Sequence, residues 1–318
     1  MRLGQGAWPT PPDPGLYLVG HWPDYEAFTF NVPAIGGLRC LPINLKQHLE
    51  PRGPLRTLRR RRRQRHYATG LGNWLNQLAP GSVVLFQDNL RVLDMLEGLE
   101  TTFCGGVLAR DLMAADLHRH RLLAGLHRRG MRVWSFDPDD CERHGFTAYT
   151  QFVRQWSAPP VAGASTDLFF VGRDKGRGAT FDRLRGLAGA AGLSVDFELP
   201  ARGTPVTYRA YLERLQGCTV VVDLVQPGQT GLTMRPVEAM VYGKKLLSDS
   251  PGAVELASAC PSQVLCIDAL PSAEELAAFV AQPAEPWPDS LRSRHLVEHA
   301  LSAVAADALR TPSVLHRP

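Results

Sequence analysis

The chain has 318 residues, of which 44% are hydrophobic and 21% charged, and its formal net charge is +4. This length is typical of about two domains of ~150 residues each, and the hydrophobic content is ample for folded cores, which excludes a disordered chain. No stretch reaches the ~20 apolar residues of a membrane span, and the start MRLGQGAWPTPPDPG lacks the apolar core of a secretory signal. We therefore expect a cytoplasmic protein with a disordered N-terminus.

The six cysteines show neither a CxxC pair nor zinc-like spacing, so free or buried thiols are the expectation. We expect no metal site and no cofactor.

The first half of the chain, residues 1–158, contains strand-like apolar runs separated by helical stretches. Strands are predicted over 16–20, 38–43, 83–87, 102–107 and 132–136. His21, Asp88 and Asp137 each follow one of these runs directly, where the ends of strands meet a ligand crevice. None of the three is singled out by sequence, because such residues also cap helices and form loops.

A run of five arginines, from Arg59 to Arg63, lies on a helix predicted over 55–78. It suits an anionic membrane surface, an acidic glycan or nucleic acid, or it forms a solvated helix face. Few aromatic residues are interleaved with it and no nucleic-acid motif accompanies it, so we expect no nucleic acid partner.

The segment Asp137-Pro138-Asp139-Asp140 has two interpretations. Paired carboxylates of the DxD type hold a divalent cation against a diphosphate. An Asp-Pro pair after a strand is also ordinary turn chemistry, which we favour.

The second half begins after a Pro- and Gly-containing stretch over 156–166 that is typical of a linker. Strands are predicted over 168–171, 193–199, 219–225 and 264–267, and helices over 179–191 and 207–216, with another beginning at Ser272. This alternation predicts a doubly wound parallel sheet.

A glycine-containing basic turn, GRDKGRG, follows the first strand of this half. Gly172 allows close approach of the backbone, and Arg173, Lys175 and Arg177 bring three cations to a helix N-terminus, which suits a diphosphate. The spacing does not match a dinucleotide fingerprint, and a solvated basic turn is the alternative.

The segment CTVVVDLVQPGQTGLTMRPVEAMVYGKKLLSDS, residues 218–250, predicts a buried strand, a polar loop, a short helix and a second strand. The loop contains Gln229, Thr230, Gly231 and Thr233. Thr233 is a plausible helix cap, Pro236 suits the first turn and Gly243 the C-terminal end. Arg235 and Glu238 are predicted to be neighbours near the helix start, where a phosphate and a ribose diol would be bound.

Three stretches resemble known proteins: GQTGLTMRPVEAMVYGKKL, FFVGRDKGR and SFDPDD. They are similar to glycosyltransferases of the GT-B type, in particular to bacterial lipopolysaccharide and capsule biosynthesis enzymes, over roughly residues 132–250. The sequence Val237-Glu238-Ala239-Met240 matches the helix signature of the nucleotide-sugar site. Many GT-B enzymes have a first Glu eight positions earlier, where this chain has Thr230.

The resemblance implies two Rossmann-like doubly wound α/β domains that face each other across a cleft. It places the acceptor domain at 1–158, the nucleotide-sugar domain at 159–283, and a C-terminal helix over 284–318 that packs back on the first domain. The implied activity is metal-independent transfer of a sugar from a nucleotide-sugar to a cell-envelope glycan or lipid-linked acceptor. The candidate donor-binding residues are Gly172, Arg173, Lys175, Arg177, Gln229, Thr230, Gly231, Thr233, Arg235 and Glu238.

An inverting enzyme needs a base, for which Asp88, His21 and Asp137 are candidates. The Arg59 to Arg63 run would hold the protein peripherally at the inner face of the membrane. A non-catalytic glycan- or nucleotide-binding partner in envelope polysaccharide assembly remains the alternative.

Overall fold

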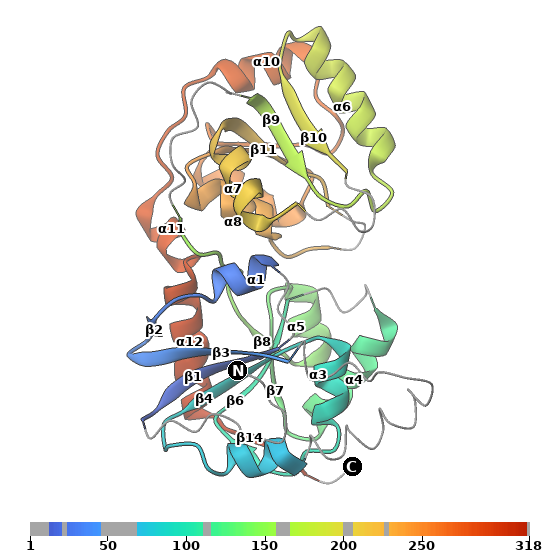
Figure 1. The fold of residues 1–318 in the computed structure, drawn as a ribbon. Coiled ribbons are helices and arrows are strands. Elements are labelled where there is room, and N and C mark those ends of the chain that lie inside the picture. Colours follow the sequence, from blue (N-terminus) through green and yellow to red (C-terminus); the bar gives the residue numbers. More distant parts are fainter. Residues whose placement is uncertain are drawn as a thin grey trace. The chain divides into compact units, whose positions relative to one another are not determined.

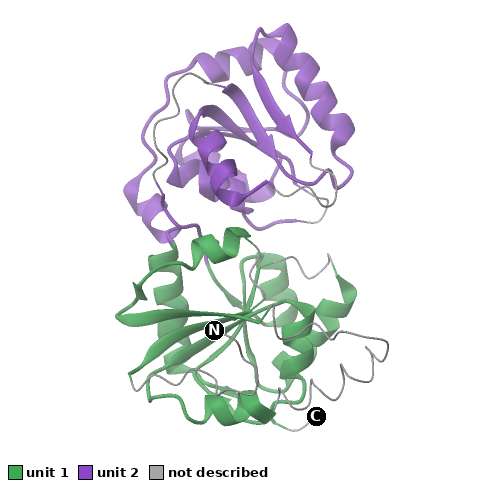
Figure 2. Ribbon diagram, in the orientation of Figure 1, with its two compact units in different colours: residues 1–149, 297–318 green, residues 150–296 purple. Residues whose placement is uncertain are grey.

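The computed structural model describes residues 13–20, 24–45, 69–110, 116–156, 166–199, 206–225 and 229–316. The predicted disordered N-terminus, His21, the run from Arg59 to Arg63 and most of the linker at 156–166 lie outside these residues. Two compact units are present, one of residues 1–149 with 297–318 and the other of residues 150–296 (Figure 2). Residues 150–158 thus belong to the second unit and the last 22 residues to the first. Boundaries at 158 and 283 for independently folding domains stay a prediction.

Unit 1 is built on a sheet whose described part has seven strands in the order β2-β3-β1-β4-β6-β7-β8. All neighbouring strands are parallel except β2 and β3, which pair antiparallel at the edge. The strands are β1 (Gly15–Gly20), β2 (Ala34–Ile35), β3 (Leu38–Asn44), β4 (Val83–Gln87), β6 (Gly105–Ala109), β7 (Arg132–Ser135) and β8 (Thr147–Ala148).

Helices cover both faces of this sheet (Figure 1). They include α1 (Asp24–Thr29), α3 (Leu90–Leu96), α4 (Leu117–Arg128), α5 (Pro138–His144) and α12 (Val297–Arg310). Helices α3 and α4 contribute Leu93, Leu123 and Leu126 to a buried core with strand β4. Helix α12 packs on β2, β4 and β6, and Asp307 on it forms an ion pair with Arg132 of β7.

The strand predicted over 102–107 is wrong as a single element. It is divided into β5 (Thr102–Phe103), which pairs antiparallel with β14 (Ser313–Val314), and β6. Gly105 has a φ of +146°, and a Cβ added there would lie 1.9 Å from the carbonyl oxygen of Val84. Only glycine permits this conformation and this approach, which break the run between two sheets.

Unit 2 has a sheet that is parallel throughout its described part, in the order β10-β9-β11-β12-β13. Its strands are β9 (Thr166–Val171), β10 (Val195–Glu198), β11 (Cys218–Asp223), β12 (Lys245–Ser248) and β13 (Val264–Cys266). Its helices are α6 (Gly178–Ala190), α7 (Tyr208–Gln216), α8 (Met234–Val241), a 3-10 turn at Pro251–Ala253, α9 (Val254–Ala259), α10 (Ala273–Ala281) and α11 (Asp289–Arg294).

Both faces of the second sheet are covered. Phe181 of α6 and Leu276 of α10 share a core with Phe170 and Val222 of the strands. Helices α7 and α8 pack on the opposite face, where Tyr211 contacts Phe169. The α/β class and the two Rossmann-like doubly wound sheets predicted from sequence are confirmed.

Each sheet reverses its winding at one place. In unit 2 the strands occur in the order second, first, third, fourth and fifth along the chain, so the switch point lies between β9 and β11. In unit 1 the corresponding point lies between β1 and β4. Ligands of such sheets bind outside the carboxyl ends of the strands at the switch point, so these two places are the candidate sites.

No helix in the described part of the chain is long and apolar enough to cross a bilayer.

Candidate functional site

Arg235 connects the carboxyl ends of β9 and β11 at the switch point of unit 2. It lies in the first turn of α8, and its guanidinium is 3.5 Å from Asp223 Oδ1 and donates to the carbonyl of Val171 at 3.2 Å. The guanidinium also lies 4.3 Å from the centroid of the Phe170 ring, within cation–π range. Its Nε is buried without a hydrogen-bond partner. A cation is therefore fixed in the crevice with one donor still available.

Asp223 is the carboxylate that ends strand β11. It is fully buried and accepts hydrogen bonds from the hydroxyls of Thr233 at 2.9 Å and Ser248 at 3.3 Å. Burial raises the pKa of Asp223, and the charge of Arg235 and the Thr233 hydroxyl act in the opposite direction. Sequence reasoning missed this residue, although an acidic residue at the end of a β-branched run was the available signal.

Arg177 reaches the same place from the turn after β9. Its guanidinium donates to the carbonyl of Leu224, just past β11, and to the carbonyls of Arg173 at 2.6 Å and Asp174 at 3.0 Å. It lies 5.3 Å from the Phe170 ring centroid. Burial, followed by the positive charge of Arg235, lowers the pKa of Arg177. Two guanidiniums that repel each other thus share one aromatic ring at the switch point.

Gly172 makes room for this arrangement. A Cβ added there would lie 2.3 Å from Nη2 of Arg235 and 3.0 Å from the Phe170 ring. Beyond it, Lys175 and Gly176 have φ angles of +51° and +83°, the left-handed region that turns the chain back so that Arg177 can reach Leu224. Arg173 and Lys175 themselves are exposed in this turn.

The loop before α8 lies at the same edge of the sheet. Gln229 and Gly231 are buried, and a Cβ on Gly252 would lie 2.9 Å from the carbonyl oxygen of Thr230, so this loop packs closely on the turn after β12. Thr233 caps α8, as predicted, by accepting from the backbone N–H of Arg235 at 3.3 Å.

The N-terminus of α6 differs from that of α8, because no side chain caps it. Its first backbone N–H groups are therefore left for water or an anion, and the helix dipole favours negative charge there. The carboxylate of Asp174 lies beside this end, 3.2 Å from where a Cβ on Gly178 would be.

Glu238 points away from the guanidiniums. It is 2% exposed, and its two carboxylate oxygens accept hydrogen bonds from Tyr208 at 2.7 Å and from Tyr211, both on α7. Burial raises the pKa of Glu238 to about 7, and it raises the pKa of both tyrosines well above 10. A ribose would have to displace a tyrosine hydroxyl to reach this carboxylate, so a ribose-binding role for Glu238 stays a prediction.

The candidate bases of unit 1 have structural partners. Asp88 is 4% exposed, accepts from the backbone N–H of Arg110 at 3.1 Å and forms an ion pair of 3.4 Å with Arg119. Asp137 caps α5 by accepting from the backbone N–H of Asp140 at 3.2 Å. Their roles as bases stay predictions.

Sequence reasoning also missed Glu26, which lies next to these residues. It is 1% exposed, accepts a hydrogen bond of 2.7 Å from Gln87 and lies 3.8 Å from Arg110. It sits on a helix of six residues whose sequence carries no periodic signal, so only the fold brings it to the end of β4.

The chain was compared with known proteins. No family model and no curated protein matches it. Among solved structures it is similar to AviGT4, a glycosyltransferase involved in avilamycin A biosynthesis, with 14% identity over 76% of this chain and 77% of that chain and a TM-score of 0.49. It is also similar to the UDP-GlcNAc 2-epimerase of Methanocaldococcus jannaschii, with 10% identity over 92% and 98% of the two chains and a TM-score of 0.49. A third similar structure is WaaG, a glycosyltransferase involved in lipopolysaccharide biosynthesis, with 13% identity over 93% and 94% and a TM-score of 0.42. We rest the function on the residues described above.

Proposed function

We propose that this protein is a glycosyltransferase that binds a nucleotide-sugar at the switch point of unit 2 and transfers the sugar to a glycan acceptor. The observation that carries this proposal is the pair of guanidiniums, Arg177 and Arg235, held across the ends of β9 and β11 beside the uncapped start of α6. A diphosphate has the charge and the acceptor oxygens that such an arrangement recognises.

The same groups suit the chemistry of transfer. When the bond to the anomeric carbon breaks, negative charge develops on the departing diphosphate. Fixed cations at that place stabilise the transition state because they need no reorganisation as the charge appears. Two guanidiniums supply this charge without a divalent cation, and we propose that the reaction is metal-independent.

The test is a thermal-shift screen with UDP-, GDP-, ADP-, TDP- and CMP-sugars, each with EDTA and with magnesium. A ligand that binds only the folded state stabilises it, by about 2.7 kcal/mol at a hundredfold excess over Kd. We expect a shift with one nucleotide class in EDTA. A shift that needs magnesium would contradict metal-independent binding.

Arg177→Gln and Arg183→Gln form a matched pair for the same screen. Both residues belong to the start of α6, but Arg183 is exposed on its outer surface. We expect Arg177→Gln to weaken nucleotide-sugar binding about tenfold or more, the loss of one charged hydrogen-bond donor, and Arg183→Gln to leave it unchanged. Equal affinities would remove Arg177 from the site.

A non-catalytic nucleotide- or glycan-binding partner is the second candidate. The enclosure of Glu238 by Tyr208 and Tyr211 favours its glycan-binding form, because that buried carboxylate is already bonded to two tyrosines and not open to a ribose. Release of nucleoside diphosphate in the presence of acceptor separates the two functions. Binding without release would support the partner role.

We propose a cell-envelope glycan, of lipopolysaccharide or capsule, as the acceptor, on the motif resemblance. The Arg59 to Arg63 run is proposed to bind an anionic membrane surface. Replacing these five residues with Gln should reduce retention on anionic vesicles, and equal retention would make the run a solvated helix face.

A further inference from the structure

A pocket lies at the amino ends of the unit 2 strands, the edge opposite to the guanidinium pair. It is formed where α7 and α8 end, at Gln216 and Val241, immediately before β11 and β12 begin. Its volume is about 370 Å³. That is within the range of small-molecule sites, about 300–1,000 Å³.

The walls of the pocket are cross-linked. The Trp287 indole N–H donates to the carbonyl of Lys244 at 2.9 Å, and the Tyr242 hydroxyl donates to that of Arg154 at 2.9 Å. The Gln216 amide donates to the carbonyl of Trp156 at 3.3 Å. These bonds join four segments distant in sequence, so the shape exists before any ligand arrives.

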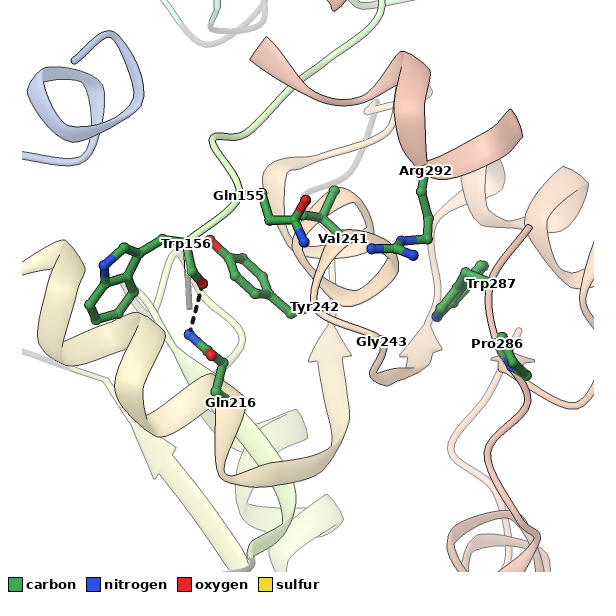
Figure 3. A pocket seen from close by; sticks show the side chains of 9 residues that line it. All are labelled: Gln155, Trp156, Gln216, Val241, Tyr242, Gly243, Pro286, Trp287 and Arg292. Carbon is green, nitrogen blue, oxygen red and sulfur yellow. Dashed lines mark hydrogen bonds between the residues drawn. The ribbon is translucent and has the colours of Figure 1, made fainter. Parts of the chain in front are cut away.

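Arg292 supplies an unsatisfied donor to this pocket. Its side chain extends from α11 toward the end of α8, as Figure 3 shows. Its Nε is buried without a hydrogen-bond partner, while Nη1 is 3.2 Å from Asp289, a side chain that is 96% exposed. Such an exposed ion pair contributes little, so the guanidinium keeps donors for a ligand.

The rest of the lining is a mixture of ring faces and amides. Tyr242 is partly exposed and its hydroxyl is bonded to a carbonyl, which leaves its ring as apolar surface, whereas Trp287 is 2% exposed and forms a buried wall. Gln155 offers an exposed amide group that both donates and accepts, and the Gln216 amide, bonded to the Trp156 carbonyl, also lines the space. Gly243, with a φ of +67°, ends α8 in the left-handed conformation and adds no side chain to the space. The Trp156 ring points away, toward Arg209.

We propose that this pocket binds a saccharide unit as a second ligand site. A sugar ring has an apolar face of C–H groups for an aromatic ring, and hydroxyls that donate to and accept from amides. Its oxygens accept from the Arg292 guanidinium in place of the exposed Asp289 carboxylate. The site lies away from the ends of β9 and β11, so a glycan bound here does not occupy the guanidinium pair.

Saturation-transfer difference NMR on the full-length protein tests the proposal, because it detects weak binding. The probes are glucose, N-acetylglucosamine and glucuronate. We expect at least one probe to give a saturable signal that persists in Arg177→Gln and in the presence of excess UDP. Loss of the signal under either condition would place the sugar at the guanidinium pair and overturn the second site.

Arg292→Gln and Arg294→Gln are the matched variants. Both residues lie on α11, but Arg294 is exposed and lies outside the pocket. We expect Arg292→Gln to weaken the probe about tenfold and Arg294→Gln to leave it unchanged. Gln155→Ala, at an exposed lining position, should also weaken it without changing the melting temperature. No signal from any probe, or equal affinity in Arg292→Gln and Arg294→Gln, contradicts the proposal.

Discussion

The two switch points of this protein have the same topology and opposite character. In unit 1 the charges at the end of β4 are buried and paired: Glu26 with Gln87 and Arg110, and Asp88 with Arg119. In unit 2, Arg177 and Arg235 are partly exposed and repel each other; Arg177 donates to backbone carbonyls, and Arg235 donates to the Val171 carbonyl and lies 3.5 Å from the buried Asp223. The charges of unit 1 are thus enclosed with their partners, whereas the two guanidiniums of unit 2 stay partly exposed. This difference is in line with the proposal that unit 2 binds the donor.

Asp88→Asn tests whether the buried charge pairs of unit 1 stabilise the fold. It removes the carboxylate partner of Arg119, and breaking a buried pair typically costs about 3–5 kcal/mol. We expect a loss of this order in the free energy of unfolding, measured in urea. Glu97→Gln, at an exposed position of the same unit, is the control and should change little. Unchanged stability with lost turnover would instead make Asp88 a catalytic base.

Glu238→Gln tests the pH dependence that the buried carboxylate imposes. The pKa of Glu238 is raised from 4.5 to about 7 on folding. Between these values the folded state binds the proton and the unfolded state does not, so stability falls as pH rises through this window and levels off above it. At ~1.4 kcal/mol per pKa unit the fall is roughly 3 kcal/mol.

The variant should lack this part of the pH dependence. Urea unfolding between about pH 5 and pH 8 measures it. Identical pH profiles of the two proteins would show that Glu238 is ionised in the folded state throughout, and so available to a ribose at neutral pH.

Gly172→Ala displaces a guanidinium and brings a Cβ within 3.0 Å of the buried Phe170 ring. The added Cβ meets the end of the flexible Arg235 side chain, which moves off Phe170 and Asp223. We expect nucleotide-sugar affinity to fall about tenfold, the value of one charged contact, with a small loss of stability. In Gly189→Ala, where nothing lies within 4 Å of the new Cβ, affinity should stay the same. An unchanged affinity in both would separate Arg235 from binding.

Thr233→Ala and Thr207→Ala compare two helix caps. Thr233 caps α8 at the switch point and Thr207 caps α7. Each loss should cost about 1 kcal/mol in unfolding. Only Thr233→Ala should also weaken nucleotide-sugar binding, because its hydroxyl donates to Asp223 beside Arg235. Equal affinities of the two variants would limit Thr233 to a capping role.

Local signals predicted the elements well. The β-branched run before residue 223 is strand β11, Thr233 caps α8, and Ser272, where a helix was predicted to begin, caps α10. These features depend on neighbours within a few residues, so the sequence contains them. The direction in which a side chain points depends instead on residues far away in the sequence.

Arg235 and Glu238 illustrate what local sequence patterns cannot predict. Three residues apart on a helix, they were predicted to serve one ligand. In the structure Arg235 extends past the start of α8 to the sheet, and Glu238 meets two tyrosines that lie 27 and 30 residues earlier in the chain. Which way each points is decided by the packing of α7 on α8, and no local pattern encodes that contact. Asp88 was found by its place after a strand, but its burial against Arg119 depends on a residue 31 positions away.

Helix α12 and strand β14 give the chain an order of assembly. Residues 150–296 are complete when they leave the ribosome, but unit 1 lacks α12 and β14 until the last 22 residues follow. Ser313 then bonds to Gly105, and Asp307 to Arg132 and Trp134, on strands synthesised long before. Because domains generally fold as units during synthesis, the second unit can fold first and the first unit must wait. A nascent chain from which residue 296 has just emerged would therefore already contain the guanidinium pair in its folded setting.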